Sequence, residues 1–370
     1  MKHCIIIGAG ILGASAAYRL AKLGAKVTVI DKKHEGQATD AAAGIVCPWL
    51  SQRRNKAWYA LAKGGARCYP DLIAELEADG EHDTGYARVG ALSLHSDRKK
   101  LEAMEKRALL RKEEAPEIGE VKLLAPEEAR AIFPLLADGY GAVHVTGAGR
   151  VDGRALRDSL LRAAKKHGAE IIYGEARLLQ TGKRVTGATA GGEIFEADVV
   201  LVAGGAWAGQ LLSPLDLGVR FQKAQIIHLR LDAMETGNWP VIMPPSDQYL
   251  VPFAGGRIVA GATHENDTGF DSSVTAGGLQ EVLNKALSSA PGLSAASFVE
   301  ARVGFRPFTP GFLPVFGPVP GLEGIMFANG LGASGLTMGP FIGTQIAKLI
   351  LGLETDLPFA DYAVTISSER

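Results

Sequence analysis

The N-terminal residues predict a strand, a tight turn and a helix arranged around three glycines. Residues 4–7 are a short apolar run typical of a strand buried on both faces, and residues 11–23 carry apolar side chains at helical spacing. Between them, Gly8, Gly10 and Gly13 form the pattern G-x-G-x-x-G. The first glycine of such a pattern permits the turn, the second lets a pyrophosphate approach the backbone, and the third lets helix and strand pack closely. The positive N-terminus of the helix can then bind an anion.

A second strand is predicted at residues 26–30, and Asp31 stands at its end. An acid about 20 residues after the glycines can accept a hydrogen bond from a ribose 2′-hydroxyl, and it disfavours a 2′-phosphate. The strand–helix–strand unit therefore predicts a dinucleotide site, although it does not separate NAD from FAD. The run of small residues Thr39–Gly44 that follows is suited to packing backbone against a cofactor. A tightly packed helix start is the alternative interpretation.

Length and composition restrict the possible classes of protein. A chain of 370 residues is too long for one compact core and suits two domains. Lys and Arg (39) nearly balance Asp and Glu (40), so no charge excess favours nucleic acid or an anionic membrane as a partner. Cys4, Cys47 and Cys68 contain no C-x-x-C pair, which argues against a disulfide framework or a metal site. With no signal-peptide pattern and no apolar stretch near the roughly 20 residues of a membrane span, we expect a cytoplasmic protein.

The middle of the chain alternates predicted helices and strands. Helical patterns cover residues 56–78 and 101–114, with a strand-like segment, "ARVGALSLHS", between them. The charged residues of "KRALLRKEE" (106–114) are assigned to a solvated helix face. Asp152 is a candidate N-cap for another helix, which Gly168 is placed to end.

From residue 220 to 263 the pattern changes to short alternating strands with turns, which predicts an antiparallel sheet. A helix at 275–289 and a strand at 297–306 follow. A second glycine-rich stretch, "MFANGLGASGLTMGPFIG" (326–343), then joins a short strand to a last helix at 336–351. It predicts another strand–turn–helix whose N-terminus can face an anion.

The motifs together resemble one enzyme family. They are the N-terminal glycines, the A-A-G run at Ala42–Gly44, "GRVDGRAL", "VVLVAGGAWA", the hairpin "YLVP…GRIVAGAT", "GFRPFTP" and "NGLGASGLTMGP". In this order they resemble the FAD-dependent oxidases of the D-amino acid oxidase superfamily, which includes glycine oxidase, sarcosine oxidase and D-amino acid dehydrogenase. The resemblance spans nearly the whole chain, and it is specific for the superfamily rather than for one substrate.

The resemblance implies an α/β plus α+β fold with two domains. A Rossmann-like FAD-binding domain is expected from the discontinuous segments 1–85, 142–216 and 303–366. A substrate domain on a mostly antiparallel sheet is expected from residues 86–141 and 217–302.

The resemblance also implies where FAD binds. Non-covalent attachment is expected, because the C-terminal region has no cysteine where sarcosine oxidases attach the flavin. The implied FAD contacts come from both glycine turns and the segments between them: Gly8, Gly10, Ile11, Leu12, Gly13, Asp31, Lys32, Thr39, Ala42, Ala43, Gly44, Ala176, Ala203, Gly204, Trp207, Arg306, Gly332, Ala333, Ser334, Gly335, Leu336 and Thr337.

Three residues are implied to act on substrate. Arg306 matches the arginine that pairs with the substrate carboxylate, and a planar guanidinium suits that role. A structural arginine is the alternative. Tyr249 matches a substrate-holding tyrosine of glycine oxidase, or it is a half-buried residue of a sheet face. His264 falls where glycine oxidase tends to carry methionine and close to a pocket histidine of sarcosine oxidases; a solvent-facing turn histidine is the alternative.

Two features leave the substrate open. Arg53 or Arg54 is a candidate second anion contact, or both belong to a solvated helix start. The C-terminal turn has only small residues, 332–335, where glycine oxidases and some relatives carry a polar or aromatic residue that touches substrate.

The implied reaction is oxidation of the C–N bond of a small amino acid, glycine or a D-amino acid. A hydride would pass from Cα to flavin N5, the imino acid would hydrolyse to a 2-oxo acid and ammonia, and oxygen or a quinone-type acceptor would reoxidise the flavin. An N-methyl or cyclic amino acid, a hydroxy acid, a NAD-linked dehydrogenase and a non-catalytic flavin-binding subunit are the alternatives. A homo-oligomer is possible.

Overall fold

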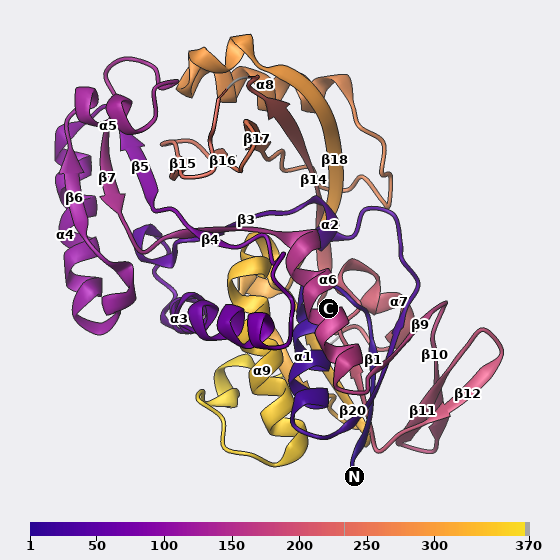
Figure 1. The fold of residues 1–370 in the computed structure, drawn as a ribbon. Coiled ribbons are helices and arrows are strands. Elements are labelled where there is room, and N and C mark those ends of the chain that lie inside the picture. The colour runs from indigo at the N-terminus through magenta and orange to yellow at the C-terminus, as the bar shows by residue number, and fades with distance from the viewer. Residues whose placement is uncertain (233, 367–370) are drawn as a thin grey trace.

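The computed structural model describes residues 1–232 and 234–366, and its central layer is a six-stranded sheet (Figure 1). The order is β19-β20-β13-β1-β2-β9, and all neighbours are parallel except β19 and β20. The strands are β1 (His3–Ile7), β2 (Lys26–Asp31), β9 (Glu170–Tyr173), β13 (Val199–Val202), β19 (Val315–Pro318) and β20 (Ile325–Asn329). The sheet therefore joins segments from the start, middle and end of the chain.

Four helices of this part of the molecule pack against one another at very short range: α1 (Ile11–Lys22), α3 (Lys56–Ala78), α6 (Gly153–Lys166) and α9 (Gly335–Leu351). Glycines allow the close approach. A Cβ atom at Gly343 of α9 would lie 2.7 Å from the Cβ of Ser15 in α1, and one at Gly65 of α3 would lie 2.0 Å from the carbonyl oxygen of Thr337. These contacts hold α9 against α1 and α3, and a Cβ atom at Gly339, near the start of α9, would lie 3.0 Å from the side chain of Ile11, the first residue of α1.

A larger sheet of eight strands forms the upper part of the molecule in Figure 1. Its order is β18-β14-β17-β16-β15-β5-β7-β6, antiparallel throughout except between β15 and β5. The strands are β5 (Ala91–His95), β6 (Val121–Leu124), β7 (Gly141–Val145), β14 (Arg220–Arg230), β15 (Val241–Met243), β16 (Tyr249–Pro252), β17 (Arg257–Gly261) and β18 (Ser297–Phe308). Helices α4 (Arg98–Glu114), α5 (Pro126–Ile132) and α8 (Ala276–Ser289) pack on it.

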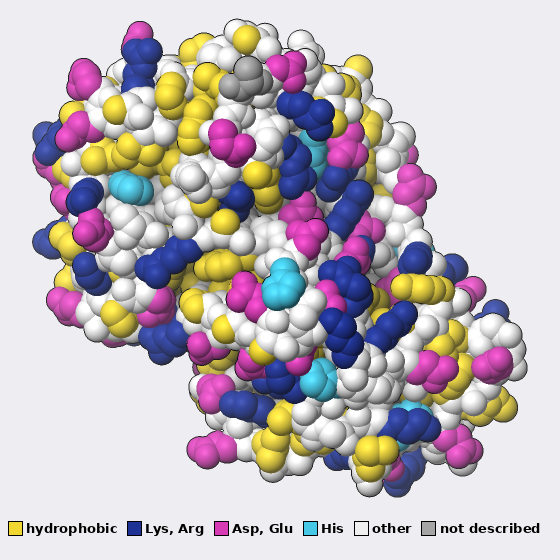
Figure 2. All heavy atoms as spheres, in the orientation of Figure 1, with side chains coloured by type: hydrophobic (Ala, Val, Ile, Leu, Met, Phe, Trp, Pro, Cys, Tyr) yellow, Lys and Arg dark blue, Asp and Glu magenta, His cyan; other side chains and the backbone are white. Residues whose placement is uncertain are grey.

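Two small antiparallel sheets complete the fold. One joins β3 (Ala43–Val46), β8 (Gly149–Asp152) and β4 (Ala87–Arg88), and the other joins β10 (Arg177–Thr181), β11 (Arg184–Ala190) and β12 (Glu193–Glu196). The short helices are α2 (Ala38–Ala41) and α7 (Ala208–Leu212). No helix in the described residues is long and apolar enough to cross a membrane. Basic and acidic side chains are interspersed over the face in Figure 2, as the balanced composition implies.

The predicted fold class, α/β plus α+β, is confirmed. Asp152 caps α6 as predicted, because its side chain accepts hydrogen bonds from the N–H groups of Arg154 (3.1 Å) and Ala155 (3.2 Å). Gly168 follows that helix with φ +89°, which suits a glycine that ends it. The strand predicted at 87–96 is in fact two, β4 and β5, because Gly90 between them has φ +80°. The residue boundaries of the two domains stay a prediction.

Candidate active site

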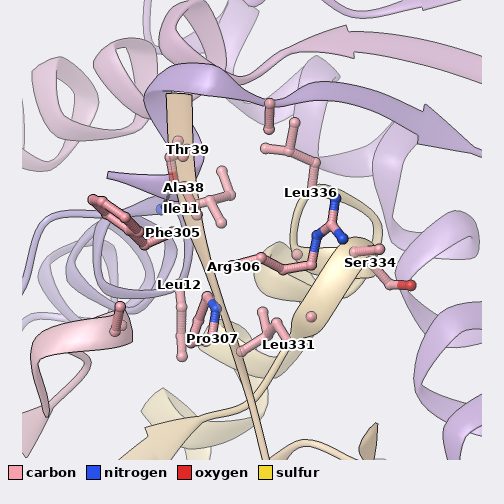
Figure 3. Close-up of a pocket in the computed structure, with 18 of the residues that line it drawn as sticks. Ile11, Leu12, Ala38, Thr39, Phe305, Arg306, Pro307, Leu331, Ser334 and Leu336 are labelled. Carbon is pink, nitrogen blue, oxygen red and sulfur yellow. Dashed lines mark hydrogen bonds between the residues drawn. The ribbon is translucent and has the colours of Figure 1, made fainter. Parts of the chain in front are cut away.

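One long cavity of about 1590 Å³ lies between the parallel sheet and the eight-stranded sheet. It is lined by both glycine turns, the ends of β1 and β2, the loop around α2 and part of β18. Figure 3 shows Ile11 and Leu12 of α1, Arg306 of β18, and Leu331 and Ser334 of the C-terminal turn around this space. Segments from opposite ends of the chain therefore form one wall.

The N-terminal glycine turn forms one end of the cavity. Gly8 has φ +106°, and a Cβ atom there would lie 2.4 Å from the carbonyl oxygen of Ala203. At Gly10 the nearest described atom to such a Cβ is the hydroxyl of Thr39 at 3.4 Å, so the space in front of it belongs to the cavity. Gly13 does not line the cavity; it is the contact point between α1 and the turn.

Asp31 holds the glycine turn against the end of β2. Its carboxylate accepts hydrogen bonds from the backbone N–H groups of Ala9 (2.5 Å) and Lys33 (2.6 Å), and from the side chain of Gln37 (3.0 Å). The Gln37 side chain bridges both carboxylate oxygens (3.0 and 3.3 Å), so a ribose hydroxyl in the cavity that Asp31 lines would compete with Gln37 for one of them. A carboxylate at this place is what a bound ribose requires.

The C-terminal glycine turn forms the opposite part of the wall. A short 3-10 helix, Gly332–Ser334, leads directly into α9. The hydroxyl of Tyr69 donates to the carbonyl of Leu336 (2.5 Å), and Thr337 donates to the carbonyl of Ile45 (2.7 Å). These bonds hold the first turn of α9 in place, and the N–H groups of a first helical turn have no partners within the helix. The N-terminus of α9 can therefore stabilise negative charge in the cavity.

Arg306 brings a positive charge into the middle of the cavity. Its side chain extends from β18 toward Ser334 and Leu336 (Figure 3). Burial lowers the pKa of Arg306, and Tyr249 opposes the shift. Among the described residues no ion pair or hydrogen bond from the Arg306 side chain to a protein group is recorded. Because a buried charge is costly unless it is paired, Arg306 is placed to bind an anion from outside the chain.

Tyr249 and His264 line the same cavity. Burial raises the pKa of Tyr249 to about 12, so its phenol stays neutral and can donate a hydrogen bond at ordinary pH. Burial first, and then the charge of Arg306, lower the pKa of His264, whose Nδ1 lies 3.4 Å from Asp247. The His264 side chain is 38% exposed, so it borders both the cavity and the solvent. The structure thus brings the three residues predicted to act on substrate into one space.

Every residue predicted to contact FAD or substrate lines this cavity except Gly13, and of the two candidate anion contacts Arg53 lines it and Arg54 does not. The sequence prediction missed part of the wall, namely Ser93–His95, the loop Met243–Gln248, and Lys100 and Arg107 of α4. The assignment of residues 106–114 to a solvated face is wrong for two of its arginines. Arg107 lines the cavity, and Arg111 donates to the carbonyls of Trp49 (2.6 Å) and Ser51 (2.7 Å). The spacing of Lys100, Ala103, Met104 and Arg107 was the available signal, because it places them on one helix face.

Comparison with known proteins identifies the family. The family model for FAD-dependent oxidoreductases, DAO, matches residues 3–349. The chain belongs to the DAO family. An uncharacterized oxidoreductase of Bacillus subtilis strain 168, YurR, is 62% identical, and the match covers 98% of both chains. A glycine oxidase of Pseudomonas aeruginosa is 32% identical, also over 98% of both chains.

A solved structure, that of iminodiacetate oxidase (IdaA) from Chelativorans sp. BNC1, is similar over 98% of this DAO-family chain and 99% of that chain. The TM-score is 0.95 and the sequence identity is 46%. This DAO-family protein is therefore an FAD-dependent oxidoreductase that acts on amino acids or amines.

The observed cavity fits FAD. A Cβ atom added at Gly332, which has φ +56°, would meet no described atom within 4 Å, and one at Gly335 would meet only the Cβ of Leu331 at 3.8 Å. These two glycines therefore border the open space of the cavity rather than tightly packed protein. With the same open space at Gly10 and the acceptors of Asp31, both glycine turns can lie against one extended cofactor.

Proposed function

We propose that the protein oxidises the C–N bond of a small α-amino acid whose amine is primary or secondary: glycine, a D-amino acid or an N-substituted glycine. The product is an imino acid, which water hydrolyses to a 2-oxo acid and an amine or ammonia. The observation that carries this proposal is Arg306, a partly buried guanidinium on the cavity wall with no recorded acidic partner among the described residues. Its planar fork matches a carboxylate in two parallel hydrogen bonds.

In this proposal each side chain has a separate task. Arg306 binds the substrate carboxylate and thereby fixes the direction of the Cα–H bond. The neutral phenol of Tyr249 donates a second hydrogen bond to the carboxylate. His264 is neutral near pH 7, because the pKa of His264 lies below its usual range, so Nε2 can accept a proton from the substrate ammonium. FAD, when bound, accepts the hydride that leaves Cα.

The cofactor contacts are part of the same proposal. The first turn of α1 and Asp31 would hold the pyrophosphate and ribose, and the N-terminus of α9 would stabilise negative charge on the reduced flavin. Similarity to a glycine oxidase and to an iminodiacetate oxidase supports both a primary and a secondary amine as substrate. Oxygen or a quinone-type acceptor would reoxidise the flavin.

An anaerobic screen tests the proposal. Glycine, D-alanine, sarcosine, D-proline and iminodiacetate are mixed with the purified flavoprotein, and loss of flavin absorbance is followed. At least one should bleach the flavin, and readmitted air or an added quinone then identifies the acceptor. If none does so, the protein does not oxidise small amino acids, and a non-catalytic flavin subunit becomes the better account.

Substitution of Arg306 tests the assigned site. For the substrate found in the screen, Arg306→Ala should lower kcat/KM at least about 30-fold, because loss of one partner of a buried charge pair costs about 2 kcal/mol or more. Arg220→Ala is the control, because Arg220 lies on the neighbouring strand β14 and pairs with Asp216 at the surface (3.0 Å). Equal activity of the two variants would show that the carboxylate binds elsewhere.

A further inference from the structure

Three basic side chains of α4 and of the loop before α3 line the cavity and have no recorded ion pair in the part of the chain that the structure describes: Arg53, Lys100 and Arg107. Arg53 and Lys100 are exposed, whereas Arg107 is partly buried and its Nε is buried without a hydrogen-bond partner. None of these residues is needed for the FAD contacts or for the role of Arg306 proposed above.

Two elements bring these cations together. Arg107 and Lys100 lie on one face of α4, seven residues apart and therefore about two helical turns from each other. Arg111, one turn after Arg107, donates to the carbonyls of Trp49 and Ser51 and so holds the loop that carries Arg53 against α4. Arg53 in turn lies over the ring of Trp58 at 4.7 Å, which limits its freedom.

The acids of the cavity wall do not neutralise this group. The described residues that line the cavity include three acids, Asp31, Glu175 and Asp247. Asp31 accepts the backbone bonds of the glycine turn, Glu175 pairs with Lys32 (3.2 Å), and Asp247 pairs with Lys285 (2.9 Å).

The acids of α4 that form ion pairs also pair with side chains other than these three cations. Glu102 pairs with Arg98 (3.1 Å) and Glu114 pairs with Lys63 (3.3 Å). Among the described residues that line the cavity, no acid therefore offsets Arg53, Lys100 and Arg107, and their positive charge adds to that of Arg306. A cavity lined by one sign of charge raises the local concentration of ligands of the opposite sign.

We propose that the substrate carries a second carboxylate and that Arg53 and Arg107 bind it, with Lys100 adding to the positive potential. This inference rests on the proposed function, in which Arg306 binds the first carboxylate. The substrate class is then an aminodicarboxylate of the iminodiacetate type, and the 46% identity to an iminodiacetate oxidase agrees with that class.

The reaction balances for this substrate. Iminodiacetate loses a hydride from one methylene carbon, whose two electrons reduce the FAD of the proposed function, and a proton from nitrogen, and a C=N bond forms. Water then adds to that carbon and the C–N bond breaks, which gives glyoxylate and glycine. Only one carboxylate lies next to the carbon that is oxidised, so the other is available to Arg53 and Arg107.

Two matched pairs of small molecules test the second site. Sarcosine differs from iminodiacetate by a hydrogen in place of one carboxylate. Glutarate and butyrate are the corresponding unreactive carbon isosteres, and their binding is measured by the change in flavin absorbance. We expect the protein to prefer iminodiacetate to sarcosine, and glutarate to butyrate, by about 10-fold or more, which corresponds to about 1.4 kcal/mol.

The variant Arg53→Gln/Arg107→Gln should reduce both preferences about 10-fold with normal FAD content. The control Arg54→Gln/Lys112→Gln removes the same charge from the neighbouring loop position and from the same helix, at residues that do not line the cavity, and should leave both preferences unchanged. If both variants lost the two preferences equally, the loss would come from the lower positive charge in general and not from the cavity site.

The inference is overturned if glutarate binds no more tightly than butyrate, or if the cavity variant keeps both preferences. Oxidation of sarcosine or glycine in that case would leave the proposed function intact. If instead no amine reduces the flavin, the proposed function fails, while the glutarate measurement still decides whether the second carboxylate site exists.

Discussion

A Cβ atom added to Gly13 would lie 1.8 Å from the carbonyl oxygen of Gly8. The first and third glycines of the N-terminal motif are therefore in direct contact, and the third acts through packing rather than through the cavity. The motif thus contains two kinds of glycine, one that faces the cofactor space and one that lets α1 lie against β1.

Gly13→Ala should destabilise the protein by about 3 kcal/mol, because the added methyl group meets backbone that cannot move without separating α1 from the turn. Urea denaturation of the FAD-saturated protein measures this. Gly277→Ala in α8 is the control, since a Cβ there meets nothing within 4 Å among the described residues. It should change the stability by less than about 1 kcal/mol. A Gly13→Ala variant as stable as wild type would refute the packing account.

Gly335→Val, in contrast to Gly13→Ala, should affect the binding of FAD and leave the stability of the protein nearly unchanged. The position is helical and its Cβ would meet only Leu331 at 3.8 Å, so the protein itself tolerates a side chain there. The added side chain would enter the space proposed for the flavin. We expect FAD to bind about 10-fold more weakly, or its reduction potential to fall, with an unfolding midpoint of the apoprotein close to that of wild type. Unchanged flavin content and potential would place the flavin elsewhere.

Tyr249→Phe should raise the dissociation constant of butyrate, and the KM of the amino-acid substrate, about 5- to 10-fold, the usual effect of removing one hydrogen bond. Because the pKa of Tyr249 is raised to about 12, its phenol does not ionise in the working range. The pH dependence of kcat/KM between pH 6 and 10 should therefore be the same in wild type and variant. If kcat/KM of the wild type fell at high pH and this fall were absent in Tyr249→Phe, the phenol would titrate in this range and the prediction would be wrong.

Asp79→Asn tests a cluster that joins α1, α3 and α6. The carboxylate accepts from the hydroxyl of Tyr18 (2.6 Å) and from Lys22 (3.1 Å), and it lies 3.1 Å from His167. Burial acts to raise the pKa of Asp79, but the hydrogen bonds from Tyr18, His167 and Lys22 outweigh it and lower the pKa to about 2.

A folded-state pKa below the unfolded value of 3.8 stabilises the protein above pH 3.8, and this stabilisation is lost as the pH falls toward 2. Asp79→Asn should therefore cost about 1–3 kcal/mol at pH 7, as removal of a buried charged partner does. The difference from wild type, measured by urea denaturation, should be constant from pH 7 to 5 and shrink below pH 4. A difference that grows on acidification would contradict the assignment.

Local sequence was sufficient for much of the fold. The strand–turn–helix at residues 4–23, the cap at Asp152 and the helix at Lys56–Ala78 depend on apolar spacing, capping residues and glycine conformation, which act within a few residues. The fold class and the family followed from the order of several such motifs. The break between β4 and β5 was missed because a single glycine, Gly90, changes the backbone direction within an otherwise strand-like segment.

The charged helix α4 shows the limit of local sequence. Alternating charges predict a solvated face, yet Arg107 lines the cavity and Arg111 holds the loop at Trp49 and Ser51. Which face of a charged helix meets solvent depends on what packs beside it, and that neighbour comes from a segment about 60 residues earlier.

The sequence by itself determined the two glycine turns, the acid at Asp31 and the presence of Arg306 in a family motif. Only the tertiary structure decided that both turns and Arg306 border one cavity, that Gly13 packs while Gly335 leaves space, and that the cations of α4 join the same wall. The physical reason is distance along the chain. Periodicity and caps report forces between near neighbours, whereas a cavity wall is set by the packing of segments that the sequence keeps hundreds of residues apart.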